Sequence, residues 1–245
     1  MSGLEGRVVL ITGAARGLGR DFARLFAADG AHVVLADVKD AEKARADAEA
    51  QGPRCIAVPT DITDSACVEA LMERTRTEFG GLDVLINNAA LWREPESVGI
   101  LDCTEEIWDA TFQINLKGQW LCYRAAAPLL RERRRGRIIN VSTTASASGS
   151  NIYGVSKCAL ELMTKGMACE MGPHGTTVNS IVPGICAFSG AKGQLPGFDE
   201  ILARIPTGRV GTSEDLYAAM AYLCSDGASY VTGENMTLDG GLSAR

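Results

Sequence analysis

Short apolar runs alternate with longer amphipathic segments along almost the whole chain, and this alternation restricts the fold more than any other feature. Strands alternating with helices predict an α/β fold, a parallel sheet with helices on both faces. No linker or repeat divides the 245 residues, so we expect one domain over 1–245. The expected strands are Val8–Ile11, His32–Ala36, Cys55–Val58, Val84–Ile86, Arg137–Val141, Val178–Val182 and Met236–Leu238. The expected helices run from Gly19 to Gly30, over Ala41–Ala50, Ser65–Phe79 and about Glu105–Leu130, and from near Tyr153 and Glu214.

Charge and cysteine content argue against several classes of function. The formal net charge is -6, whereas affinity for nucleic acid rests on accumulated Lys and Arg, so no nucleic-acid partner is expected. The eight cysteines form no C-x-x-C pair and only two histidines are present, so no metal site is expected. No signal-like or membrane-spanning apolar run occurs, and we expect a cytoplasmic protein that does not bind membranes.

The segment TGAARGLG joins the first expected strand to the first expected helix. Gly13 permits a tight turn, Gly17 lets the backbone approach a pyrophosphate, and Gly19 lets the helix pack on the strand. The helix N-terminus also favours an anion. The loop therefore predicts a dinucleotide site on a doubly wound sheet of Rossmann type. The residues expected to contact the cofactor here are Gly13, Arg16, Gly17, Leu18 and Gly19.

Asp37 follows the second expected strand, 24 residues after Gly13. A carboxylate at this place accepts hydrogen bonds from both ribose hydroxyls and repels a 2′-phosphate, which favours NAD over NADP. The next residue, Val38, brings no cation to the adenosine ribose. Arg16 and Lys39 are the cations that would meet a 2′-phosphate. Because of these two residues, NADP remains the less favoured alternative.

Tyr153 and Lys157 are four residues apart at the start of an expected helix and therefore share a face. A chance Y-x-x-x-K is expected in roughly one such chain in eight, so the pair alone is weak. Together with the glycine loop, it makes the sequence resemble the classical short-chain dehydrogenase/reductase family over nearly its whole length.

Further motifs of that family occur in the family's order. The resemblance implies an adenine contact at Asp61 and Ile62, and a cofactor contact at the N-N-A-G-like segment Asn87–Ala90, in which Ala90 replaces the usual Gly. It also implies a P-G turn beneath the nicotinamide. The cofactor contacts implied are Asp61, Ile62, Asn88, Ala89, Ala90, Tyr153, Lys157, Pro183, Gly184 and Ile185, and Asn115 is implied as a member of the catalytic tetrad.

The expected chemistry is the transfer of a hydride between nicotinamide and an alcohol or ketone carbon. Tyr153 would take the hydroxyl proton, but a phenol has a pKa near 10 and is mostly protonated at neutral pH. Lowering that pKa to about 7 takes roughly 4 kcal/mol, which one cation about 4 Å away supplies at an effective dielectric near 20. Lys157 is the expected cation. By resemblance it also holds the nicotinamide ribose, and Asn115 positions a water that relays the proton.

The family's substrate-orienting serine has no exact counterpart. Strand register along GRIINVST places Thr143 at that position, with Ser142 one residue earlier as the alternative. Thr143 lies ten residues before Tyr153, closer than the family implies, so the loop Thr144–Asn151 is contracted. The family's Thr after the P-G turn is also missing, and Phe188 stands in its place.

The resemblance places a variable substrate lid at about 185–205. Trp92, Phe188 and Phe198 are the expected substrate contacts, and they favour a small-to-medium apolar or aromatic secondary alcohol or ketone. Packing of the lid or of a subunit interface is an equally good reading of these apolar side chains.

Three alternatives remain. An NADP-dependent carbonyl reductase, including the 3-oxoacyl type, is favoured by Arg16 and disfavoured by Asp37. An enoyl reductase is disfavoured because that branch spaces its Tyr and Lys further apart. A catalytically silent nucleotide-binding scaffold has no need of the Tyr–Lys pair. The resemblance further implies a homotetramer or homodimer, with interfaces on the Glu105–Leu130 and Tyr153–Met171 helices and the C-terminal segment.

Overall fold

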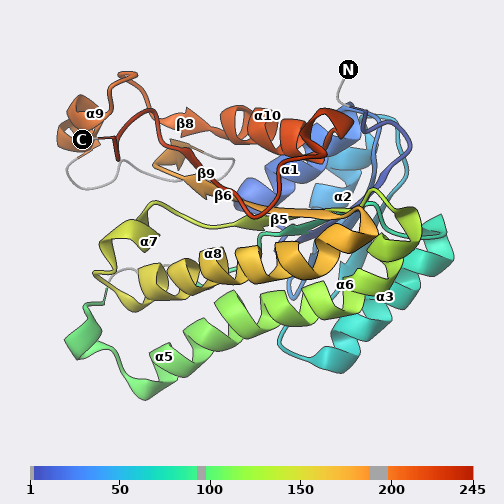
Figure 1. Ribbon diagram of the computed structural model, residues 1–245, viewed down its shortest axis with the longest axis horizontal. Helices are drawn as coiled ribbons and strands as arrows, with labels where there is room; N and C mark the ends of the chain where they lie inside the picture. The colour runs from blue at the N-terminus through green and yellow to red at the C-terminus, as the bar shows by residue number, and fades with distance from the viewer. Residues whose placement is uncertain (1–2, 93–97, 188–197, 245) are drawn as a thin grey trace.

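The computed structural model describes residues 3–92, 98–187 and 198–244 (Figure 1). Seven parallel strands form its central sheet in the order β3-β2-β1-β4-β5-β6-β9. The strands are β1 Val8–Thr12, β2 His32–Asp37, β3 Cys55–Pro59, β4 Val84–Asn87, β5 Arg137–Val141, β6 Thr177–Pro183 and β9 Asn235–Leu238. The fold class is confirmed as a single doubly wound α/β domain of Rossmann type.

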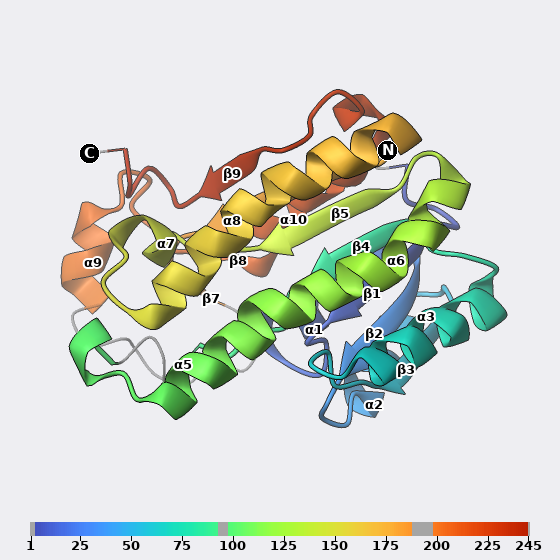
Figure 2. The same ribbon diagram turned by 60° about the horizontal axis from the view of Figure 1, so that its bottom comes forward.

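Helices cover both faces of this sheet, as Figure 1 shows. On one face lie α1 (Gly17–Ala28), α2 (Glu42–Glu49) and α10 (Ser213–Cys224). On the other face α3 (Ser65–Phe79), α6 (Gln119–Arg133) and α8 (Ile152–Met171) lie over the strands (Figure 2). The remaining helices are the short α5 (Glu105–Phe112), α7 (Ala145–Ser148) and α9 (Phe198–Arg204), with 3-10 turns at Ile100–Asp102, Gly172–His174 and Asp226–Ala228.

Alternating side chains of each strand enter two separate hydrophobic clusters. Val9 and Ile11 of β1 pack with the α1 and α10 side, while Val8 and Leu10 pack with the α3, α6 and α8 side. All four side chains are 3% exposed or less. The apolar run therefore has no polar alternation, because both faces of a parallel sheet with crossover helices are buried.

The expected helix over Glu105–Leu130 is interrupted. A π-helical turn, Gln113–Gly118, joins α5 to α6, which continues to Arg133. Gly118 stands against the Ile62 side chain, where a Cβ atom would come within 2.8 Å of Cδ1. Asn115 lies within the turn and is fully buried. Tertiary contacts at these two residues account for the turn, which hydrophobic periodicity does not reveal.

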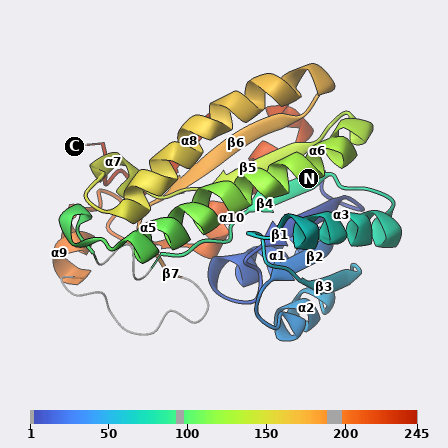
Figure 3. The same ribbon diagram turned by 90° about the horizontal axis from the view of Figure 1, so that it is seen from below.

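Short elements frame the segment expected to be the lid. The two-residue strands β7 (Cys186–Ala187) and β8 (Gly211–Thr212) pair in parallel outside the main sheet. Helix α9 lies before β8, and α7 fills the contracted loop between β5 and α8 (Figure 3). Periodicity over two to seven residues carries little signal, and none of these elements was expected.

Two further observations concern the described residues alone. None of their helices has the length and apolar character needed to cross a membrane. Their His, Cys, Asp and Glu side chains do not gather in groups of three that would hold a metal ion.

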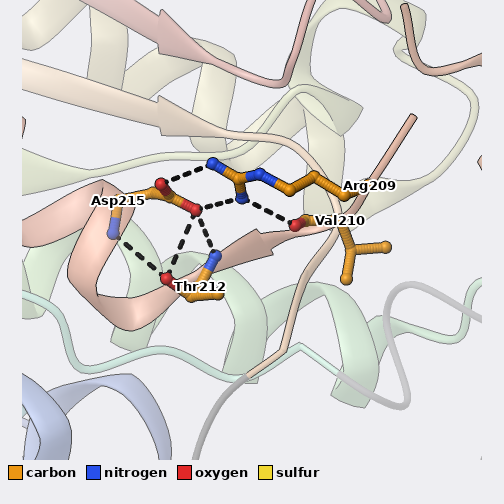
Figure 4. Close-up of polar contacts among 4 residues, drawn as sticks. All are labelled: Arg209, Val210, Thr212 and Asp215. Atoms are coloured by element: carbon orange, nitrogen blue, oxygen red, sulfur yellow. Dashed lines mark hydrogen bonds and ion pairs between the residues drawn. The ribbon is translucent and has the colours of Figure 1, made fainter. Parts of the chain in front are cut away.

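Arg209 and Asp215 tie β8 to the start of α10 (Figure 4). The guanidinium donates to both oxygens of the carboxylate, at 2.6 and 2.8 Å. The same carboxylate accepts from the Thr212 backbone at 2.8 Å, and the Thr212 hydroxyl accepts from the Asp215 backbone at 3.3 Å, which completes a capping box. The hydrogen bonds from Arg209 hold the pKa of Asp215 well below its ordinary value.

We predict that Thr212→Ala lowers the free energy of unfolding by about 1 kcal/mol, the usual loss for an N-cap. Asp215→Asn should also destabilise the protein at pH 7. Because the folded pKa of Asp215 is depressed, its contribution is present above the unfolded pKa near 3.9 and declines as the pH falls below that value. Urea unfolding at pH 7 and pH 3 measures both effects, with Asp109→Asn on the exposed side of α5 as the control. If Asp215→Asn lowered the free energy of unfolding by the same amount at pH 3 as at pH 7, the link between the Asp215 pKa and stability would be contradicted.

Candidate active site

The carboxyl ends of the strands bring the expected site residues to one edge of the sheet. β1 and β4 are neighbours in the sheet although β2 and β3 lie between them in the chain, which creates a switch point. Ligands of open α/β sheets bind beyond the strand ends at such points. Figure 2 shows the strands running toward the end of the molecule where α7 and the start of α8 lie. The residues at this edge include Gly13, Asp37, Asn88, Thr143 and Gly184.

The glycine loop has the backbone that its sequence predicts. Gly13 and Gly17 have φ of 67° and 59°, in the left-handed region that favours glycine. A Cβ atom at Gly19 would meet the Gly13 carbonyl oxygen and would lie 2.6 Å from Nδ2 of Asn88. Helix α1 therefore begins in direct contact with the turn after β1. Leu18 packs against the core and Arg16 is exposed.

Asn88 and Thr12 hold this loop against the segment that follows β4. The Asn88 amide donates to the carbonyl oxygens of Thr12 and Gly13 at 2.9 and 3.1 Å. In return, the Thr12 hydroxyl accepts from the backbone N–H groups of Asn88 and Ala89 at 3.0 and 3.1 Å. The half-buried Ala90 comes next. The two loops expected to contact one cofactor are thus bonded to each other.

Asp37 turns its carboxylate toward the glycine loop. Oδ2 accepts from the backbone N–H of Ala15 at 2.9 Å, and Oδ1 accepts from that of Lys39 at the same distance. Both oxygens retain lone pairs for a further donor. Val38 is 67% exposed beside it. The side chain is thereby fixed where the second strand ends, next to the α1 N-terminus.

Asp61 and Ile62 follow β3 at the same edge. Oδ1 of Asp61 accepts from the backbone and hydroxyl of Thr63, at 2.8 and 2.7 Å. Ile62 is 6% exposed and contacts Gly118. Asp61 is therefore held in a turn with its side chain at the surface, whereas Ile62 belongs to the core.

Tyr153 and Lys157 occupy one face of the first two turns of α8. Asn151 caps this helix by accepting from the Gly154 N–H at 2.8 Å. Lys157 is 1% exposed, and its Nζ donates to the Val141 carbonyl at 2.7 Å. That Nζ lies 5.9 Å from the centroid of the Tyr153 ring. Burial lowers the pKa of Lys157 to about 8, and the negative charge of Glu161 opposes this change.

Asn115 joins three parts of the site. Its Oδ1 accepts from the Leu91 N–H at 2.8 Å, and its Nδ2 donates to the Leu91 carbonyl at 2.9 Å and to the Ser156 hydroxyl at 3.1 Å. Ser156 donates in turn to the Tyr153 carbonyl at 2.7 Å. Asn115 is therefore a side-chain bridge from the π turn to α8 and to the segment after β4.

The two candidates for the substrate-orienting hydroxyl have different partners. The Ser142 hydroxyl donates to the Glu161 carboxylate and is 4% exposed. The Thr143 hydroxyl accepts from the Ala145 N–H at 3.3 Å and is less deeply buried. Sequence reasoning did not single out Glu161 or Ser156. The position of Glu161, four residues after Lys157 on the same helix, was the available signal.

The P-G turn ends β6 and packs tightly on the C-terminal segment. The Gly184 N–H donates to the Leu238 carbonyl at 3.0 Å, and a Cβ atom at Gly184 would lie 2.7 Å from Cβ of Asp239. Ile185 accepts from the Gly211 N–H at 2.9 Å and so connects Pro183–Ile185 to β8.

The expected substrate residues are described only in part. Trp92 follows β4 and is 36% exposed. Phe188 lies outside the described residues. Phe198 is the first residue of α9, and its side chain is outside the described part of the structure.

Taken together, the edge carries a glycine turn and helix N-terminus suited to an anion, a carboxylate suited to sugar hydroxyls, and a phenol beside a buried amine suited to proton transfer. Asp37 ends β2, the glycine loop follows β1, and Lys157 is bonded to the end of β5, so these groups lie along the adjacent strands β2-β1-β4-β5 at one edge of the sheet.

The chain is similar to known proteins over almost its whole length. A family model described as Enoyl-(Acyl carrier protein) reductase matches residues 13–243. A (2S)-[(R)-hydroxy(phenyl)methyl]succinyl-CoA dehydrogenase subunit from Thauera aromatica is 36% identical, over 98% of both chains. A 3-oxoacyl-[acyl-carrier-protein] reductase from Escherichia coli is 32% identical, over 97% of this chain and 98% of the relative.

Solved structures with the same fold cover the chain equally well. A putative short-chain alcohol dehydrogenase from Sinorhizobium meliloti has a TM-score of 0.91 at 33% identity, covering 99% of this chain and 98% of its own. A short chain dehydrogenase from Burkholderia cenocepacia, solved in complex with NADP, has a TM-score of 0.89 at 32% identity, covering 98% of each chain.

We predict that Gly19→Ala destabilises the protein by about 1–3 kcal/mol, the usual cost of overpacking, because the added methyl group meets backbone and the Asn88 amide. Gly166→Ala in the exposed middle of α8 is the matched control. Its Cβ meets nothing within 4 Å, so it should stabilise the protein by about 0.5–1 kcal/mol. Urea unfolding of both variants tests the contact of Gly19 with Gly13 and Asn88. Equal stabilisation by the two substitutions would show that the glycine loop moves to accommodate the methyl group at little cost.

Proposed function

Because the chain belongs to the short-chain dehydrogenase/reductase family, we propose that it is an NAD-dependent enzyme that transfers a hydride between nicotinamide and a secondary alcohol or ketone. Oxidation and reduction at alcohol and ketone carbons is the activity of this family. The observation that carries the finer proposal is the placement of Tyr153 beside the buried Lys157, at the same sheet edge as the glycine loop and Asp37.

The residues present fit a nicotinamide dinucleotide. At Gly13 and Gly19 a Cβ atom would fill the narrow space between the loop and Asn88, so only a bare backbone forms this cradle. The residues that would hold the cofactor are Gly13, Arg16, Gly17, Leu18, Gly19, Asp37, Val38, Asp61, Ile62, Asn88, Ala89, Ala90, Tyr153, Lys157, Pro183, Gly184 and Ile185. When bound, the nicotinamide ring accepts or supplies the hydride.

Tyr153 exchanges the proton of the substrate hydroxyl in the proposed mechanism. The Lys157 ammonium favours the phenolate form of Tyr153 by its positive charge. One of its three N–H groups is donated to Val141, which leaves two for the ribose and the phenol. Asn115 holds the Leu91 backbone and, through Ser156, the first turn of α8, so the phenol keeps its position.

Thr143 is the proposed donor to the substrate oxygen. The Ser142 hydroxyl is already donated to Glu161, which supports Thr143 over Ser142 for this role. The oxygen of Thr143 accepts from the Ala145 N–H, so its own proton is available for donation to substrate.

The proposed substrate is a small-to-medium apolar or aromatic alcohol or ketone. Trp92 is partly exposed on the segment that Asn115 anchors, and Phe188 and Phe198 belong to the proposed lid over 185–205. The relative from Thauera aromatica acts, by its name, on a hydroxy(phenyl)methyl group.

We also propose a cytoplasmic homotetramer or homodimer that associates through α5, α6 and α8. Large apolar side chains are exposed on these helices: Trp108 by 46%, Trp120 by 38% and Leu162 by 71%. Large exposed apolar side chains of this kind are typical of protein interfaces.

An NADP-dependent carbonyl reductase of the 3-oxoacyl type is the second candidate. Arg16 is exposed within the glycine loop, where a 2′-phosphate would be reached, and the similar Burkholderia cenocepacia structure holds NADP. A reductase of this type would prefer NADPH and the reductive direction.

Asp37→Ala should weaken NADH binding by about tenfold to a hundredfold, because a hydrogen bond to a charged group contributes roughly 1.5–3 kcal/mol. NADPH binding should weaken less or improve, since the repelling charge is removed. Titration of wild type and variant with NADH and NADPH, followed by nicotinamide fluorescence, measures this. Asp40→Ala, three residues along on the exposed surface, is the control. If the wild type bound NADPH more tightly than NADH, Arg16 or Lys39 would be the residue that selects the cofactor, and the NADP-dependent carbonyl reductase would be favoured.

Tyr153→Phe should lower kcat by about 10²–10⁴, the usual contribution of general acid–base catalysis, and leave NADH affinity nearly unchanged. Turnover of a panel of aliphatic and aromatic secondary alcohols and ketones measures the loss. Tyr230→Phe, whose side chain is fully exposed, is the control. Retained turnover in Tyr153→Phe would remove Tyr153 from the mechanism. A wild type that binds NADH but turns over none of the panel would indicate a nucleotide-binding scaffold.

A further inference from the structure

Two consecutive residues at the end of β5 are bonded to α8. The Val141 carbonyl accepts from Nζ of Lys157 at 2.7 Å, and the Ser142 hydroxyl donates to the carboxylate of Glu161. Glu161 lies one helical turn beyond Lys157 and two beyond Tyr153, so the three side chains share one face of α8. The strand end and the helix are therefore joined by two adjacent polar contacts.

The second of these contacts controls where Thr143 lies. The backbone on either side of Thr143 is held by β6, because Ser142 donates to Ile181 and Thr144 donates to Pro183, both at 2.9 Å. Those bonds fix the strand end relative to the sheet but not relative to α8. The Ser142–Glu161 bond supplies that constraint together with the neighbouring Lys157–Val141 bond, and it acts on the residue next to Thr143.

Glu161 also lies one helical turn from a charge that the protein interior disfavours. The Lys157 ammonium is 1% exposed, and desolvating an ammonium costs several kcal/mol unless it is paired or hydrogen-bonded. Glu161 raises the pKa of Lys157 against the effect of burial. On α8 the titratable residues nearest Lys157 in the sequence are Tyr153, Cys158 and Glu161, and Lys165 follows Glu161 by one helical turn. The described hydrogen-bond partners of Lys157 and Glu161 on neighbouring elements, Val141 and Ser142, are uncharged.

We propose that Glu161 is a positioning residue for the Tyr153–Lys157 pair, which fixes the end of β5 through Ser142 and balances the Lys157 ammonium with its own negative charge. The kinetic consequence rests on the proposed function, whereas the contact and the charge balance do not. Lys157 carries its charge below its pKa and loses it as the pH rises. Removing the Glu161 carboxylate lowers that pKa, so the charge is lost at a lower pH.

The direct test is an NMR titration of the protein labelled with [ε-13C]lysine. The protein has six lysines, and the signal of Lys157 is assigned as the one that is missing from Lys157→Arg; its titration midpoint is expected near its pKa of about 8. We expect Glu161→Gln to lower this midpoint by roughly 0.5 pH or more, the effect of removing one nearby charge. Glu161→Asp and Ser142→Ala keep the charge and should keep the midpoint. Glu170→Gln, on the same helix and bonded to Tyr123, is the matched control.

An unchanged midpoint in Glu161→Gln would overturn the charge balance. This titration needs neither cofactor nor substrate, so it gives a result even if the wild type shows no turnover. The absence of turnover would contradict the proposed function but not the charge balance.

The kinetic test compares kcat/KM from pH 7 to pH 9. Glu161→Gln should lose activity at lower pH than wild type, so its kcat/KM at pH 9 relative to pH 7 falls about two- to threefold further. Ser142→Ala should lower kcat/KM by the same factor at every pH, because it frees the strand end without removing the charge. If Glu161 had only a structural role, Glu161→Gln would reduce the thermal stability of the protein and lower kcat/KM by the same factor at every pH. That result, or a Glu161→Gln profile matching Glu170→Gln, would overturn the proposal.

Discussion

Burial of the parallel sheet on both faces is the constraint on which the rest of the molecule depends. A strand covered by helices on each side offers no surface to a ligand, so polar side chains inside it must satisfy one another. Near the carboxyl ends of β4 and β5, Asn87 donates to Asn140 at 2.9 Å and Asn140 donates to Thr164 at 2.8 Å. Polar groups are left free to meet a ligand only where the strands end.

The two ends of the sheet use their polar residues differently. At the amino ends, the buried Arg7 and Arg137 donate to the carbonyl oxygens of Cys224 and Ser225, at 2.6 and 3.2 Å. Cations there stabilise the C-terminus of α10, where the helix dipole is negative. At the carboxyl ends, the α1 N-terminus and the start of α8 present N–H groups instead. The direction of the strands therefore decides which end binds an anionic cofactor and which end is structural.

Much of this arrangement could be predicted from the sequence, because its causes are local. Apolar runs identified the strands, and the spacing of glycines and of Tyr153 and Lys157 identified the loop and the helix face. Features set by tertiary contacts could not be predicted. The π turn depends on Asn115 reaching Leu91 and on Gly118 meeting Ile62, which are far apart in the sequence.

The role of Glu161 was hidden for a related reason. A carboxylate four residues after a lysine normally indicates a solvated pair on a helix surface. Here the lysine is buried and the carboxylate accepts from a strand end instead.

Two carboxylates attach the functional parts of the site to opposite regions of the same sheet. Asp37 ends β2 and is bonded to the glycine loop, whereas Glu161 is bonded to the end of β5. β2 and β5 are three strand spacings apart in the order β2-β1-β4-β5, or about 14 Å at roughly 4.8 Å per spacing. Because hydrogen bonds between strands fix that separation, it cannot adjust to a short ligand. An extended ligand, with a sugar at one end and its reacting group at the other, is the kind that meets both carboxylate-anchored regions at once.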